Sequence, residues 1–200
     1  GARFSHAAGD YAEQAAYALA LFGEKALPQV PALVELLPEK SAARTLSVAF
    51  AGIGPGTLPA LSQALTNSDP RLHYGAVCAI RHQAMTDARR LSATNALPAL
   101  LVALNDSDVE VCRLVVETLG YFVGQQPERV VPALKLQLAN ADAQVRIHAL
   151  NSLMHLYREQ DPKALLATMK PLLNDPDDRV RQCAEVHVRN LEKWLAERKP

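Results

Sequence analysis

The stretch Leu173–Ala184, LNDPDDRVRQCA, decides the fold because three earlier stretches repeat its pattern. These are LTNSDPRLHYGA from Leu65, LNDSDVEVCRLV from Leu104 and LANADAQVRIHA from Leu138. The four align without a gap and place one aspartate of each in register, at separations of 39, 34 and 35 residues: Asp69, Asp108, Asp142 and Asp177. A period of about 20 to 50 residues is typical of solenoid proteins.

Apolar residues recur at fixed distances from the aligned aspartate. Positions three, seven and eleven after it are apolar in all four stretches, which is the spacing of one face of an α-helix. Positions four and eight before it are leucine or methionine, which indicates another amphipathic helix upstream. Each repeat is therefore predicted to be a pair of helices joined by a short turn, and the aspartate lies in that turn.

The aspartate is predicted to cap the second helix of its repeat. A carboxylate there accepts hydrogen bonds from the free backbone amides and favours the positive end of the helix dipole. In SDPRL, Pro70 follows Asp69 at the first helical position, where no backbone donor is needed. The acidic cluster NDPDDRVRQCAE also lacks the glycine of a calcium-binding loop. We therefore expect caps at these turns and no metal site.

The repeats are predicted to form one domain over residues 1–200. Their expected ranges are 1–23, 24–54, 55–86, 87–124, 125–160 and 161–200. In the second repeat Ser41 takes the aligned position, and in the first only a second helix, Gly9–Gly23, is recognisable. Because an array that begins inside a repeat exposes an apolar face, we expect the chain to be a fragment of a longer protein.

The segments LPAL, NDSDVEV, NADAQVR and NDPDDRVR resemble the HEAT repeat family, in particular the short HEAT-like repeats named after phycobilin lyases. The resemblance covers nearly the whole chain. It implies an all-α fold, a right-handed α-solenoid of antiparallel helix pairs of the HEAT/armadillo type, whose second helices line a concave groove. Family members are mostly scaffolds that hold protein partners, and a minority attach chromophores or bind nucleic acid.

Outward-facing positions of the second helices are the predicted binding surface for a protein or peptide partner. The predicted partner-binding residues, here called the second-helix row, are Tyr74, His82, Arg113, Glu117, Tyr121, His148, Asn151 and His155. The row mixes both signs of charge and contains two tyrosines, which suits a peptide or protein surface with a few aromatic anchors. The alternative interpretation is that these are simply solvated faces of amphipathic helices.

Other functions have weaker support in the sequence. Lys and Arg number 21, as do Asp and Glu, and aromatic residues make up 5%, which disfavours nucleic-acid binding. No run of about 18 apolar residues predicts a membrane span. A chromophore-lyase-like activity, or another lyase or regulatory subunit, is the alternative function.

That alternative rests on Cys112 and Cys183 in the first turns of their helices, where a helix dipole lowers a thiol pKa. No histidine is tied to either cysteine by the repeat pattern, so we expect no catalytic residue and no cofactor. The three cysteines are odd in number and unevenly spaced. This pattern favours reduced thiols and a cytoplasmic location over a disulfide framework.

Overall fold

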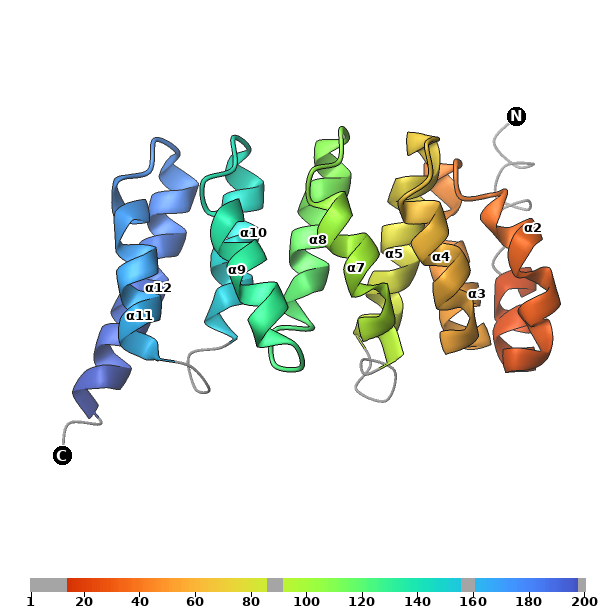
Figure 1. The fold of residues 1–200 in the computed structure, drawn as a ribbon, viewed down its shortest axis with the longest axis horizontal. Helices are drawn as coiled ribbons and strands as arrows, with labels where there is room; N and C mark the ends of the chain where they lie inside the picture. The colour runs from red at the N-terminus through yellow and green to blue at the C-terminus, as the bar shows by residue number, and fades with distance from the viewer. Residues whose placement is uncertain (1–13, 86–91, 156–160, 198–200) are drawn as a thin grey trace. The chain divides into compact units, whose positions relative to one another are not determined.

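The computed structural model describes residues 14–85, 92–155 and 161–197, and all regular structure in these ranges is helical (Figure 1). No strand occurs in them. The all-α fold expected from the repeat pattern is therefore confirmed.

The helices follow the predicted order of a first and a second helix in each repeat. The first helices are α2 (Val30–Val34), α4 (Leu58–Leu65), α7 (Leu97–Ala103), α9 (Pro127–Gln137) and α11 (Pro162–Met169). The second helices are α3 (Ala43–Ile53), α5 (His73–Ala84), α8 (Val109–Gly120), α10 (Ala143–Met154) and α12 (Asp178–Glu197).

Shorter elements complete the pattern. Residues 14–22 are helical and belong to the second helix predicted at Gly9–Gly23, whose residues 9–13 lie outside the described part. The 3-10 helices are η1 (Gly23–Gln29), η2 (Lys40–Ala42), η3 (Pro55–Thr57), η4 (Pro70–Leu72), η5 (Thr94–Ala96) and η6 (Lys170–Asn174).

The chain divides into two compact units, unit 1 (Gly1–Thr118) and unit 2 (Leu119–Pro200). Their boundary falls inside α8. The single domain expected over residues 1–200 stays a prediction.

The core of unit 1 consists of the apolar positions that the repeat predicts. Leu61 and Leu100 of the first helices, and Ala76, Ile80 and Val115 of the second helices, are fully buried. Burying a leucine, isoleucine or valine side chain stabilises a fold by about 1.5–3 kcal/mol. Repeat-predicted positions also form the core of unit 2, where they are Leu134, Val145, Ala149, Leu153, Met169, Val180, Ala184 and Val188.

One register prediction is wrong, because Glu39 and not Ser41 is the counterpart of the aligned aspartates. Glu39 has an extended backbone (φ −81°, ψ 93°) and precedes η2, which leads into α3. Asp69 has nearly the same backbone (φ −87°, ψ 104°) and precedes η4, which leads into α5. Ser41 lies inside η2, so it cannot occupy the extended position before the helix.

Gly52 allows an unusually close contact between α3 and the helix of residues 14–22. A Cβ atom on Gly52 would lie 2.1 Å from the Cβ and 2.3 Å from the Cα of Ala20. Because Ala20 presents backbone rather than the flexible end of a side chain, only a shift of one helix could relieve this overlap. Gly52 therefore sets the distance between these two helices.

We expect Gly52→Ala to lower the free energy of unfolding by about 1–3 kcal/mol, the usual cost of overpacking a core. Helix propensity alone would favour alanine by about 1 kcal/mol, so the sign of the change reports which effect dominates. Thermal unfolding followed by circular dichroism measures it. Gly56→Ala is the control, because the nearest atoms there are the side-chain ends of Leu27. Equal midpoints for both variants would contradict the close contact.

Candidate functional site

The aligned aspartates cap the second helices in all four repeats, as predicted. Each side chain accepts a hydrogen bond from a backbone amide two or three residues later. The bonds are Arg71 N to Asp69 (3.1 Å), Glu110 N to Asp108 (2.9 Å), Val145 N to Asp142 (3.0 Å) and Arg179 N to Asp177 (2.9 Å). These carboxylates are therefore used inside the fold.

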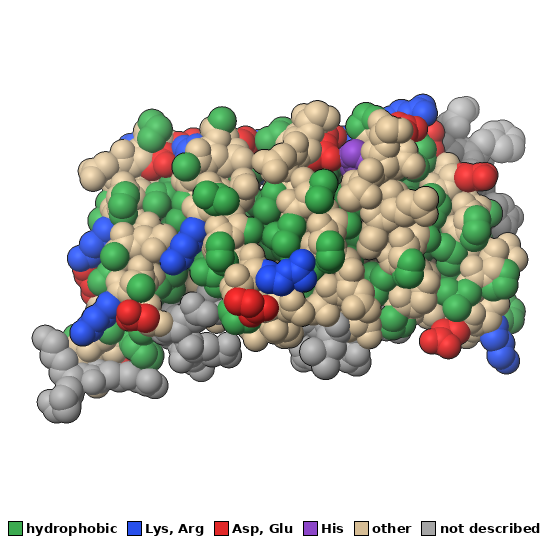
Figure 2. Space-filling model, in the orientation of Figure 1, with side chains coloured by type: hydrophobic (Ala, Val, Ile, Leu, Met, Phe, Trp, Pro, Cys, Tyr) green, Lys and Arg blue, Asp and Glu red, His purple; other side chains and the backbone are tan. Residues whose placement is uncertain are grey.

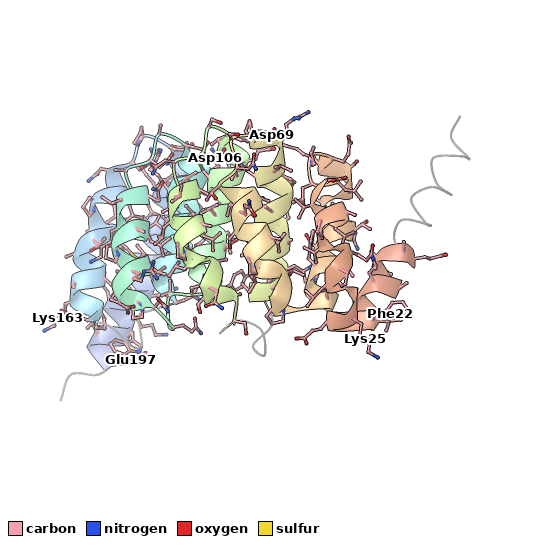
Figure 3. The ribbon with its side chains drawn as sticks, turned by 45° about the vertical axis from the view of Figure 1, so that its right-hand side comes forward. Phe22, Lys25, Asp69, Asp106, Lys163 and Glu197 are labelled. Carbon is pink, nitrogen blue, oxygen red and sulfur yellow. The ribbon has the colours of Figure 1, made fainter. Side chains whose placement is uncertain are left out.

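A second side chain, two residues before the aspartate, fixes the turn itself. In each repeat its oxygen accepts a hydrogen bond from the backbone N–H of the aligned aspartate, which is the bond of an Asx turn. The acceptors are Asn67 (2.9 Å), Asp106 (2.8 Å), Asn140 (2.9 Å) and Asp175 (2.9 Å). Figure 3 shows Asp69 and Asp106 at the same end of the helices of unit 1, away from Phe22 and Lys25.

In unit 1, His73 joins two successive turns. Its Nε2 lies 2.7 Å from the carbonyl oxygen of Asn67 in its own turn, and its Nδ1 lies 2.5 Å from Oδ2 of Asp106 in the next turn. Both ring nitrogens of His73 therefore face oxygen acceptors. The two side chains are 13% and 4% exposed, so this link is largely shielded from water.

In unit 2, Arg146 makes the equivalent link from the same position of its repeat. Its Nη1 donates to the carbonyl oxygens of Asn140 (2.8 Å) and Ala141 (3.0 Å) in its own turn. Its Nε and Nη2 donate to the two carboxylate oxygens of Asp175 in the next turn, at 2.8 and 2.7 Å. The guanidinium lowers the pKa of Asp175 below the ordinary value of 3.8. A carboxylate with a lowered pKa stabilises the fold above pH 3.8, and that contribution is lost as the pH falls through the folded-state pKa.

Arg146→Ala is expected to destabilise the fold by about 3–5 kcal/mol, because it leaves the carboxylate of Asp175 buried without its partner. Urea unfolding at pH 7 measures the loss. Arg179→Ala is the matched control, since the pair of Arg179 with Asp177 is exposed to solvent (65% for the arginine) and should matter little. A similar small loss for both variants would contradict the role of Arg146.

In wild type, stability should also fall on acidification below about pH 4, and it should fall less in Asp175→Asn.

The structure places the four unit 1 members of the second-helix row on α5 and α8, all half-buried. The ring of Tyr74 lies 4.8 Å from Nζ of Lys40, which also bonds Asp108 (3.0 Å) and Glu110 (2.8 Å). These two carboxylates raise the pKa of Lys40. Lys40 therefore connects side chains of three successive repeats.

The acidic member of the row in unit 1, Glu117 of α8, is paired. Arg81 of α5 donates to it at 2.5 Å. Its carboxylate therefore already has a cationic partner within the unit. Arg113, one turn earlier on α8, is half-buried beside it in the row.

A hollow of about 350 Å³ lies among the second helices of unit 1. Its lining combines the helix of residues 14–22, α3 and α5, and consists of Ala16, Tyr17, Arg44, Thr45, Val48 and His82. His82 is the one member of the second-helix row among these residues. Arg44 and Val48 fall five and nine residues after Glu39, the corrected reference position. Arg113 and Glu117 of the second-helix row hold the same positions after Asp108. Sequence reasoning missed them because it used Ser41 as the reference.

Of the unit 2 members of the row, Tyr121 directly follows α8, His148 and Asn151 lie on α10, and His155 directly follows α10. Tyr121 and His148 are half-buried, whereas Asn151 and His155 are exposed. The Nε2 atom of His148 lies 3.3 Å from the side-chain amide of Gln144.

Asn151 holds a small cluster with two residues of α12. Its Oδ1 accepts hydrogen bonds from Nε2 of His187 (2.8 Å) and from the thiol of Cys183 (3.5 Å). Burial, together with the nearby His155, lowers the pKa of His187. The spacing of four residues between Cys183 and His187 could have revealed this cluster in the sequence.

Charged side chains of unit 1 gather at the turns and on the second helices. Figure 2 shows mostly hydrophobic and uncharged side chains over α4 and α7. Val102 of α7 is 65% exposed on a first helix. The ion pairs of Lys40, His73 and Arg81, in contrast, all involve a turn or a second helix.

Residues 58–154 match a family model described as HEAT repeats. This part of the chain is a HEAT repeat array. The prediction of HEAT repeats is confirmed for these residues, whereas the phycobilin-lyase-like subtype stays a prediction. Among the curated proteins compared, none matches the sequence significantly.

Solved structures of similar fold are repeat proteins. Two engineered proteins from the Northeast Structural Genomics Consortium align with TM-scores of 0.60 and 0.62, at 20% and 22% identity. Each alignment covers 90% of this chain and 90% or 92% of the other. A designed armadillo repeat protein in complex with the peptide (KR)4 aligns with a TM-score of 0.58 at 16% identity, over 90% of this chain and 91% of that one. At these identities the similarity shows the solenoid fold alone.

The cysteine thiols do not have the features of nucleophiles. All three cysteines, Cys78, Cys112 and Cys183, are free, and burial raises the pKa of each. This is opposite to the lowering expected from the helix dipole at Cys112 and Cys183. The thiol of Cys112 donates to the carbonyl oxygen of Asp106 (3.2 Å), and that of Cys183 donates to Asn151 rather than to a base.

Metal binding and membrane spanning are two further possibilities for the described ranges. No group of three or more His, Cys, Asp or Glu side chains there could hold a metal ion. No helix there is both long and apolar enough to cross a membrane.

We expect the three thiols to react with iodoacetamide at pH 7 more slowly than free cysteine does, because a raised pKa leaves less thiolate. Mass spectrometry of the intact chain between pH 7 and 10 measures the rate for each thiol. Unfolding in urea should restore the rate of free cysteine. Faster alkylation than free cysteine at pH 7 in the folded protein would contradict the buried thiols and revive the lyase alternative.

Proposed function

We propose that the chain is a non-catalytic scaffold that binds a peptide or protein partner along the outward surface of its second helices, the concave side in the HEAT geometry. The observation that carries the proposal is the state of the two tyrosines of the row. Tyr74 and Tyr121 are half-buried, so each ring is partly held before a partner arrives and loses little conformational freedom on binding. Tyrosines held in this way are typical anchors of protein interfaces.

Polar side chains next to these rings support the same function. His82, Arg113, Glu117, His148, Asn151 and His155 supply donors, acceptors and both signs of charge. A partner that lies along the second helices would exchange hydrogen bonds with them, as at the polar parts of ordinary protein interfaces. The similar designed armadillo repeat protein was solved with the peptide (KR)4, which is consistent with peptide binding by this class of fold.

Catalysis and nucleic-acid binding have no comparable support. Burial raises the pKa of the thiols. The equal numbers of basic and acidic residues provide no net electrostatic attraction for a phosphate backbone. Three free thiols support a reducing compartment, for which we propose the cytoplasm.

The test combines Tyr74→Ala, Tyr121→Ala and His155→Ala in one variant. A partner is first identified by cross-linking to the wild-type chain, and its affinity for purified wild type and variant is then measured by calorimetry. Because truncating an interface anchor typically costs about 2 kcal/mol or more, we expect the affinity to fall at least about tenfold. Circular dichroism checks that the variant is folded, and leucine replaces alanine at the tyrosines if it is not.

The control variant carries three matched changes on the first helices. Val102→Ser, Lys135→Ala and Leu136→Ser alter exposed side chains of α7 and α9, one in unit 1 and two in unit 2. We expect this variant to keep wild-type affinity. Loss of affinity in the control alone, or in neither variant, would exclude the second-helix row as the binding surface.

A further inference from the structure

The hollow on the second helices of unit 1 has a mixed lining. Three of its residues are apolar or aromatic, namely Ala16, Val48 and Tyr17. The other three, Arg44, Thr45 and His82, have side chains that can donate hydrogen bonds. A ligand that suits this lining has an aliphatic portion and a group that accepts hydrogen bonds.

Arg44 differs from the other cations near the second helices of unit 1. Lys40 is bonded to Asp108 and Glu110, Arg71 is paired with its own cap Asp69, and Arg81 is paired with Glu117. Arg44 is exposed, and across residues 14–85, 92–155 and 161–197 it has neither an ion pair nor a side-chain hydrogen bond. Its charge is therefore available to a ligand.

The chemistry of a single guanidinium selects the kind of anion. The planar fork of arginine matches a carboxylate, which it binds through two parallel hydrogen bonds. Phosphorylated motifs are typically bound by clusters of arginines, and Arg44 is the one arginine or lysine in the lining. A hydroxyl such as that of Thr45 can donate to the same carboxylate.

We infer that this hollow is a subsite for the side chain of an acidic residue, glutamate or aspartate, in a peptide segment of the partner. The carboxylate binds Arg44 and Thr45, and the aliphatic part of the acidic residue or its neighbour packs against Val48 and Tyr17. The inference rests on the proposed function, which it deepens by naming the chemistry that the N-terminal part of the second-helix surface recognises.

The probe is the acetylated and amidated pentapeptide Ala-Leu-Glu-Leu-Ala, titrated into the ¹⁵N-labelled whole chain and followed by NMR. We expect its shifts to centre on the amides of Arg44, Thr45 and Val48. The peptide with glutamine in place of glutamate should bind about tenfold more weakly, because it loses a charge-assisted bidentate contact. The peptide with phosphoserine at that position should not bind more tightly than the glutamate peptide.

Arg44→Gln is expected to lower the affinity for the glutamate peptide about tenfold and to leave the thermal midpoint unchanged, since Arg44 has no partner to lose. Arg129→Gln, which alters an exposed arginine of α9, is the matched control and should keep wild-type affinity. Equal affinities of wild type and Arg44→Gln for the glutamate peptide would overturn the subsite. So would equal affinities for the glutamate and glutamine peptides, tighter binding of the phosphoserine peptide, or no binding at all.

These results are separable from those of the proposed function. If the variant changed at Tyr74, Tyr121 and His155 loses its partner while Arg44→Gln keeps the glutamate peptide, the subsite fails and the scaffold function stands. If Arg44→Gln loses the glutamate peptide while the triple variant keeps its partner, the subsite stands and the wider row is wrong.

Discussion

The interaction on which the structure depends is the hydrogen bonding at the turn between the two helices of each repeat. Solenoid repeats contact only their neighbours, so the register of each repeat has to be set locally. Apolar burial supplies most of the stability but is not directional. The turn supplies direction. One side chain holds the turn, the aligned aspartate caps the second helix, and in each unit a histidine or arginine bonds to the next turn. His73 with Asp106 in unit 1 and Arg146 with Asp175 in unit 2 make that continuation.

The hydrogen bonds at the turns limit which side chains remain available to a partner. The carboxylates of the turns already accept hydrogen bonds from backbone amides, and two of them, Asp106 and Asp175, also bond His73 and Arg146. We therefore assign these carboxylates a structural role. In the repeat at the unit boundary, Cys112 takes the position of His73 and Arg146, and its thiol donates to the carbonyl oxygen of Asp106. The following turn has Asn140, whose side-chain amide donates to Gln137 at 2.8 Å. Both side chains are uncharged, and each is satisfied within its own unit. We therefore propose that the groups available to a partner lie on the outward faces of the second helices.

Local features of the fold could be predicted from the sequence, and non-local ones could not. The helix pairs and the caps at Asp69 and Asp142 follow from spacings within a dozen residues, where helix geometry fixes which side chains share a face. The pairs His73 with Asp106 and Arg146 with Asp175 span 33 and 29 residues. The residue type at the donating position changes from repeat to repeat, so no pattern marked it.

The candidate site was predictable to a smaller extent for a related reason. Tyr74, His82 and Tyr121 came from the well-aligned repeats and lie on or at the ends of the expected helices. Tyr17 and Arg44 come from the first two predicted repeats, in which the alignment identified no matching aspartate, so it had no fixed point there. The contact of Asn151 with His187 depends on how two helices pack, which a repeat alignment does not give.

The most direct test of the turn network is a double-mutant cycle on Arg146 and Asp175. Free energies of unfolding are measured in urea at pH 7 for wild type, Arg146→Met, Asp175→Leu and the double variant. If the pair couples successive turns, the double variant should lose less stability than the two single variants added together, with an interaction energy of about 1–3 kcal/mol. An interaction energy near zero would show that the repeats keep their register without this bond, and would contradict the account.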